Sequence, residues 1–166
     1  MSTYHGRFRT NYFHVTDVEK FKNLMSRIVT DAFLEVFCTS SHNTQQTAES
    51  TRFSVGFGGG CALLGVVDTP QRDISDTFKC QPIEQAGWNE AFQEADFDQM
   101  VSELQEILPD NDAIIIMNSG YENLRYMVGE AIIITKNNCK HISVGDIAKM
   151  EACRMLGMDW DTCLEY

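Results

Sequence analysis

The stretch RFSVGFGGGCALLGVV (residues 52–67) places four glycines within five positions, between two apolar runs. Glycine-rich loops in such a setting can cradle a phosphate. A P-loop, however, ends in Lys followed by Ser or Thr, whereas these glycines run into CALLGVV, and no Lys or Arg lies between Arg52 and Arg72. No helical pattern follows the glycines either, so no helix N-terminus is available for an anion. The stretch is therefore predicted to be a β-hairpin, with glycine supplying the tight turn.

Cysteine and histidine are the other residues that could do chemistry. The six cysteines are spread along the chain with no CxxC pair, which favours reduced, buried thiols over nucleophiles, metal ligands or disulfides: Cys38, Cys61, Cys80, Cys139, Cys153 and Cys163. Cys139 and His141 form the one near pair, and a structural zinc site requires four ligands. Nothing in the spacing marks a Cys/His pair for nucleophilic catalysis. We therefore predict no catalytic residue, no metal and no cofactor.

Carboxylates are unevenly distributed in a chain of net charge −11. Residues 1–60 hold six Lys/Arg against five Asp/Glu, a balance of +1, and residues 61–166 hold seven against nineteen, a balance of −12. No Lys or Arg occurs between Lys79 and Arg125. That interval, here called the acidic tract, contains Glu84, Glu90, Glu94, Asp96, Asp98, Glu103, Glu106, Asp110, Asp112 and Glu122.

A surface of one sign repels nucleic acid and attracts basic protein surfaces. Exposed helices usually mix the two signs, which stabilises them by a few tenths of a kcal/mol per pair. The acidic tract therefore serves either a basic partner or solubility alone, and both interpretations remain open. The predicted partner-binding residues lie on a helix at 96–108 and beside it: Glu90, Glu94, Asp96, Asp98, Glu103, Glu106, Asp110 and Asp112.

Hydrophobic periodicity predicts the elements of the first half. NYFHV (11–15) is a short strand, and the Thr16–Glu19 capping box starts the helix that follows it. AFLEVFC (32–38) is a second strand, and the polar segment 39–50 is a surface loop. The hairpin at 52–67 completes this half, and residues 68–90 show only a weak pattern.

The second half has the clearer patterns. The helix at 96–108 begins with Asp96 as N-cap, ends at Pro109, and carries one apolar stripe: Phe97, Met100, Val101, Leu104, Ile107 and Leu108. DAIIIMNSG and LRYMVGEAIIITK are two strands, antiparallel across NSGYEN. HISV is a short strand after the turn NNCK, and a last helix has Ser143 and Asp146 at its start.

These elements predict an α+β protein with an antiparallel sheet of six to seven strands covered by about three helices. The chain is interpreted as a single domain, 1–166, with 1–67 and 90–166 as candidate sub-halves joined by the irregular segment 68–89. No apolar run of about eighteen residues is present, and MSTYHGRFRTNYF lacks the apolar core of a signal peptide. A cytoplasmic location is the expectation.

Two segments resemble known proteins. RTNYFHVTDVEKFKNLM is similar to the opening of small acidic proteins carried by phages, plasmids and conjugative elements, which begin with a strand of N-Y-F-x-V-x-D type and a helix. NLRYMVGEAIIIT, ISVGDI and the final EY resemble the closing half of the same group. The resemblance covers about a third of the chain and implies a defence antagonist, such as an anti-restriction or anti-CRISPR protein that imitates nucleic acid.

The leading hypothesis is thus a non-enzymatic inhibitor, made by a phage or other mobile element, that binds the basic groove of a host CRISPR-Cas or restriction complex through an acidic, nucleic-acid-mimicking surface. It is not expected to bind nucleic acid or membrane directly. Two alternatives remain open. One is a structural or assembly homodimer formed through sheet edges. The other is a small nucleotide-binding enzyme using residues 39–95, where Asp68, Arg72, Asp73 and Asp76 cluster in the sequence.

Overall fold

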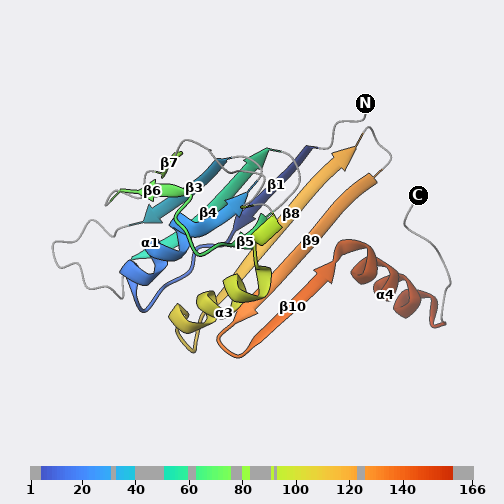
Figure 1. The fold of residues 1–166 in the computed structure, drawn as a ribbon. Helices are drawn as coiled ribbons and strands as arrows, with labels where there is room; N and C mark the ends of the chain where they lie inside the picture. The colour runs from blue at the N-terminus through green and yellow to red at the C-terminus, as the bar shows by residue number, and fades with distance from the viewer. Residues whose placement is uncertain are drawn as a thin grey trace.

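A computed structural model describes residues 5–30, 33–39, 51–59, 63–75, 80–82, 91, 93–122 and 126–158. Figure 1 shows the arrangement of the elements. In chain order they are β1 (His5–Thr10), α1 (Val18–Arg27), β2 (Ile28–Thr30), β3 (Phe33–Thr39), β4 (Arg52–Gly59), β5 (Leu63–Val66), β6 (Arg72–Ile74), β7 (Cys80–Pro82), α3 (Phe97–Ile107), β8 (Ala113–Glu122), β9 (Tyr126–Thr135), β10 (Asn138–Ser143) and α4 (Val144–Leu156).

The main sheet has six strands in the order β10-β9-β8-β1-β4-β3, and every pairing between neighbours is antiparallel. Two small two-stranded sheets, β2-β5 and β6-β7, lie beside it. With three described helices, the chain is an α+β protein with an antiparallel sheet, as the sequence predicts. β1 pairs with β8 on one side and β4 on the other, so strands from both halves of the chain form one sheet.

α1 and α3 pack against each other and against one face of this sheet, and the main core lies between them (Figure 1). Phe21 of α1 is fully buried, with its ring 5.8 Å from that of Phe13 and 4.8 Å from that of Phe53. The sheet contributes alternate residues, among them Ile114, Ile116 and Ile134. Burial of these apolar side chains, at about 25 cal/mol per Å², holds the two helices on the sheet.

The predicted hairpin at 52–67 is wrong in its pairing, although both of its strands exist. β4 pairs with β1 and β3 in the main sheet, whereas β5 pairs with β2 in a separate sheet. Gly56, Gly58 and Gly59 lie within β4 rather than in a turn, and residues 60–62, which follow them, lie outside the described part. The alternating pattern identifies a strand and the face it buries, but it does not identify the neighbouring strand.

Two predictions at the N-terminus are also corrected. The first strand is β1 rather than NYFHV, where only Phe13 forms an isolated bridge, with Phe53. The N-cap of α1 is Asp17, whose carboxylate accepts from the backbone N–H of Lys20 at 3.0 Å. Thr16 instead donates its hydroxyl and its backbone N–H to the carbonyl of Ile107, which joins the start of α1 to the end of α3.

Most of the remaining predicted elements are confirmed, but two predictions are wrong. The last three residues of the predicted turn NNCK belong to β10, and the segment 68–89, predicted to be irregular, contains β6 and β7. β3 covers the predicted second strand, and β8 and β9 are antiparallel neighbours. α3 has Asp96 as N-cap, and its stripe is buried as predicted, with Phe97 only partly so. α4 starts after the N-cap Ser143, with Asp146 in its first turn, and ends at Gly157 in the left-handed region. Of the loop predicted at 39–50, Thr39 belongs to β3 and residues 40–50 lie outside the described residues. None of the described helices is long and apolar enough to cross a membrane.

Candidate functional site

The acidic tract includes α3 and the segments on either side of it. Seven of its eight predicted partner-binding carboxylates belong to described residues, and Glu90 lies outside them. They do not form one uniform surface. Three are held by contacts within the fold, two form exposed ion pairs, and two have no cationic partner in the described part of the chain. These three groups have different chemical capacities and are considered in turn.

Asp96 caps α3. Its Oδ1 accepts the backbone N–H of Gln99 at 2.9 Å, which satisfies one of the free amides at the helix start. The backbone of Asp96 also forms two hydrogen bonds with Val66 of β5, at 3.0 and 2.8 Å. Both groups fix the start of α3 against β5, so Asp96 has a structural role.

Glu103 lies on the side of α3 that faces α1. Its carboxylate forms an ion pair with the guanidinium of Arg27 and accepts from Gln99 Nε2 at 3.0 Å. Arg27 also donates to the backbone carbonyl of Val67 at 3.3 Å and to Asn23 Oδ1 at 3.0 Å. The side chains of Arg27 and Glu103 are 12% and 27% exposed, so this pair is shielded from solvent and from an incoming partner.

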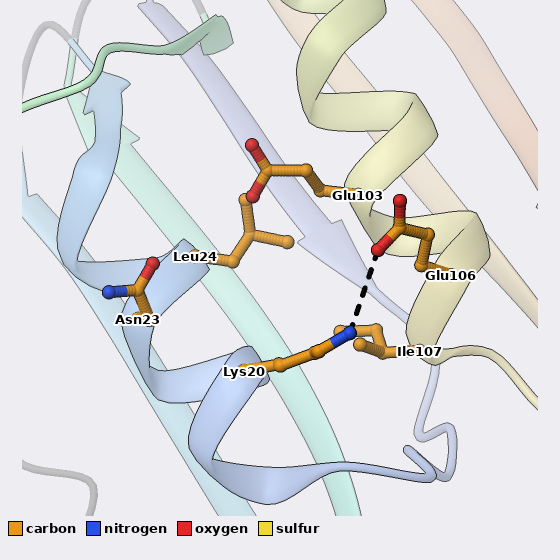
Figure 2. A pocket seen from close by; sticks show the side chains of 6 residues that line it. All are labelled: Lys20, Asn23, Leu24, Glu103, Glu106 and Ile107. Carbon is orange, nitrogen blue, oxygen red and sulfur yellow. Dashed lines mark ion pairs between the residues drawn. The ribbon is translucent and has the colours of Figure 1, made fainter.

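A shallow groove of about 370 Å³ separates α1 from α3. Figure 2 shows its walls, which are formed by Lys20, Asn23 and Leu24 of α1 and by Glu103, Glu106 and Ile107 of α3. Lys20 Nζ lies 3.7 Å from Glu106 Oε2 across its mouth, and both side chains are about two-thirds exposed, at 63% and 67%. Water screens such a pair, so it contributes at most about 1 kcal/mol. The groove contains no group poised for catalysis.

Asp110 forms the second exposed pair, 3.1 Å from Lys136 Nζ. Its side chain is 85% exposed, so this pair is also weak. Glu94 and Asp98 are exposed and have no cation within ion-pair distance among the described residues. Asp98 faces β10 closely enough to raise the pKa of the Cys139 thiol, although burial is the larger cause of that shift. Glu94, Asp98, Glu106 and Asp110 are thus the carboxylates that a basic surface could reach.

Asp112 is held by the segment before α1. Its Oδ2 accepts both the backbone N–H and the ring Nδ1–H of His14 at 2.8 Å, and its Oδ1 accepts the N–H of Ala113 at 2.8 Å. A carboxylate only accepts, so His14 Nδ1 carries the proton, and Nε2 accepts from Arg52 Nε at 3.2 Å. This resembles the His–Asp part of a catalytic triad, but Nε2 faces a guanidinium rather than a nucleophile. The contact is structural.

We expect Asp112→Asn to lower the free energy of unfolding by about 1–2 kcal/mol at pH 7. If the oxygen of the new amide kept both hydrogen bonds from His14, its NH₂ group would face the backbone N–H of Ala113, and two donors would oppose each other. Burial acts to raise the pKa of Asp112, but the hydrogen bonds from His14 and Ala113 outweigh it and hold the pKa below its ordinary value of 3.8. The stabilisation by the ionised carboxylate is therefore complete above its ordinary pKa of 3.8, and it is lost as the pH falls through the lowered pKa of the folded protein.

Urea denaturation of both proteins over a pH series measures this difference. It should be largest at neutral pH and should shrink in the acid range below 3.8. A difference of the same size at every pH would contradict the role given to the ionised carboxylate.

The alternative sites predicted from the sequence gain no support. Cys139 and His141 both lie on β10 on the face that carries Ile134 and Ile132, and His141 forms an exposed contact of 3.5 Å with Glu130. No cluster of three or more His, Cys, Asp or Glu residues suited to a metal ion occurs among the described residues. In the proposed nucleotide-binding region, Arg72 and Asp73 are neighbours on β6 and Asp68 is exposed, while Asp76 lies outside the described residues.

Sequence reasoning did not predict which side chains form ion pairs or hydrogen bonds with the carboxylates of the acidic tract. Arg27 and Glu103 are 76 residues apart, and His14 and Asp112 are 98 apart. Lys20 and Lys136 also come from outside the interval that lacks Lys and Arg. No local pattern could reveal these pairs, because each joins segments that are distant in the sequence. Comparison of the chain with protein-family models, with curated proteins and with solved structures gave no match.

Proposed function

We propose that the protein is a non-enzymatic inhibitor that binds the basic groove of a nucleic-acid-handling protein through the exposed carboxylates around α3. The observation that carries the proposal is that Glu94, Asp98, Glu106 and Asp110 remain accessible on that side of the molecule. Two of them have no cationic partner among the described residues, and the other two form exposed pairs that a basic surface can displace at little cost.

The proposed contact set is smaller than the eight carboxylates predicted from the sequence, of which Glu90 lies outside the described residues. Asp96, Glu103 and Asp112 are occupied by the helix cap, by Arg27 and by His14. The target class, a host restriction or CRISPR-Cas complex, rests on the resemblance of the two terminal segments to acidic proteins of mobile elements. Carboxylates that replace nucleic-acid phosphates would act by occlusion, with fast and salt-sensitive association.

The test is inhibition of DNA cleavage by a panel of restriction endonucleases and CRISPR effectors over a salt series. We expect wild-type protein to inhibit at least one of them, with an affinity that falls as salt rises. Glu94→Lys/Asp98→Lys should weaken the inhibition by about tenfold or more, because it reverses two accessible charges without disturbing a contact of the fold.

The matched control is Asp68→Lys/Asp73→Lys, which makes the same change of net charge at exposed positions between β5 and β6 and on β6. It should inhibit like wild type. Equal loss in both variants would reduce the effect to net charge alone, and equal activity in both would remove the α3 surface from the proposal.

A further inference from the structure

α4 is capped at both ends but buries no side chain. Ser143 caps its start, and the N–H of Met158 bonds to the carbonyl of Cys153 at its end. None of its residues is buried, and it packs mainly against β9 and β10. It lies beyond the β10 edge, away from α1 and α3 (Figure 1). Helices of this length are marginal in water and owe their stability to the packing of an apolar face.

The apolar side chains of α4 are the largest exposed hydrophobic group in the described part of the chain. Their exposed fractions lie between 50% and 76%: Val144, Ile147, Met150, Met155, Leu156 and the following Met158. Three of the six are methionines, whose flexible side chains adapt to a binding surface. Single exposed apolar residues are ordinary, but a group of this size marks an interaction surface.

Besides α4, the molecule has another incompletely covered apolar surface, on the face of the main sheet opposite α1 and α3. Ile115 pairs with Ile133, and Met117 pairs with Ala131, so these four side chains share that face. Met117 is 49% exposed. We call this patch of β8 and β9 the open face. The helix begins on the same side, because a Cβ on Gly129 would lie 2.9 Å from Val144 Cγ2.

The strand sequences show that the open face is built to be covered. A sheet with one solvated face alternates apolar and polar residues. β8 begins AIIIM, and β9 contains AIII, both continuous apolar runs of the kind found in strands buried on both faces. One face is buried by α1 and α3, and the same strands carry apolar residues on the other.

We infer that a second copy of this chain covers the open face with its α4, and that the two copies exchange helices in a two-fold symmetric dimer. The chain's own α4 follows β10 with no loop residue, so it is held at the sheet edge. α4 and the open face of one chain are both apolar and both uncovered. A two-fold axis would bring α4 of each copy onto the open face of the other, so that the same contact forms twice.

The charges around the open face permit this association in a chain of net charge −11. Arg9 pairs with Met117 across β1 and β8, Arg7 lies two residues along β1, and Lys140 pairs with Ile133 from β10. These cations lower the repulsion that two acidic molecules otherwise experience. The incoming helix carries two acids, Asp146 and Glu151, and two bases, Lys149 and Arg154, so its formal charge is balanced and adds no repulsion. The proposal is independent of the carboxylates around α3, so either can fail alone.

Sedimentation velocity on the full chain tests the inference, from about 1 µM to about 100 µM, a range that detects even a weak interface. Wild-type protein should sediment as a dimer of twice 18.8 kDa. Met150→Glu on α4 and Met117→Glu on the open face should each weaken association by about tenfold or more. Ser102→Glu, at an exposed residue of α3 on the opposite face of the sheet, should leave the dimer intact. A monomeric wild type over the whole range would overturn the proposal.

A mixing experiment distinguishes helix exchange from other dimers. Met150→Glu retains a wild-type open face, and Met117→Glu retains a wild-type α4, so an equimolar mixture restores one of the two helix–sheet contacts. We expect the mixture to associate more strongly than either variant alone. Absence of recovery would mean that α4 packs on α4, or the sheet on the sheet, and would reject the exchange.

Hydrogen exchange on wild-type protein supplies a readout that needs no substitution. Protection of the α4 amides should rise with protein concentration, since dimerisation covers the helix. Protection that does not depend on concentration would likewise count against the dimer.

Discussion

Gly65→Ala is expected to lower the free energy of unfolding by about 3 kcal/mol or more. Gly65 has a φ of +137°, a conformation that an L-residue with a side chain rarely adopts. A Cβ there would lie 2.4 Å from both the carbonyl carbon and the oxygen of Asp96 and 2.6 Å from the N of Phe97. These are backbone atoms, so no side chain can move aside. The start of α3 would have to leave β5, and the cap at Asp96 would be disturbed.

Urea denaturation measures the loss, and Gly157→Ala is the matched control. Gly157 also has a positive φ, of +67°, but nothing lies within 4 Å of its hypothetical Cβ. Alanine there should cost about 1 kcal/mol, from backbone conformation alone. Equal destabilisation by the two substitutions would show that the close approach of β5 to α3 contributes nothing.

Gly65 shows which features of the fold can be predicted from the sequence and which cannot. The alternation of Phe53, Val55 and Phe57 identifies β4, and the stripe from Met100 to Leu108 identifies α3 with its cap, because each pattern is a property of one element. The destination of β5 depends instead on packing between distant segments. Gly56, Gly58 and Gly59 belong to β4 itself, so the run of glycines does not by itself indicate a tight turn between β4 and β5.

The candidate site divides in the same way. The acidic tract and the helix that carries three of its ten carboxylates were predictable, since both are continuous in the sequence. The division of its carboxylates was not, because the side chains that bind Glu103 and Asp112, Arg27 and His14, come from the first 30 residues. Absence of Lys and Arg from an interval of sequence is therefore a poor measure of net charge on a surface. The exposure of Glu94, Asp98, Glu106 and Asp110 is what supports an accessible acidic patch.

Glu103→Lys is expected to lower the free energy of unfolding by about 2–3 kcal/mol, which makes it the second large effect. The substitution places an ammonium group against Arg27, whose side chain is only 12% exposed. Breaking a fully buried ion pair costs about 3–5 kcal/mol, and the 27% exposure of Glu103 reduces that cost. Arg27 would also lose the partner that orients it toward the carbonyl of Val67.

Glu106→Lys, one helical turn away, makes the same change of charge beside Lys20, where both side chains are more than 60% exposed. It should cost less than about 1 kcal/mol, because water screens the repulsion. Thermal and urea denaturation of the two variants therefore separate a carboxylate that holds α1 on α3 from one that is free to meet a partner. If the two cost the same, Glu103 is not shielded by Arg27 and returns to the set of contact residues. If they differ as expected, a loss of inhibition in Glu103→Lys reports a weakened fold, whereas a loss in Glu106→Lys reports the binding surface itself.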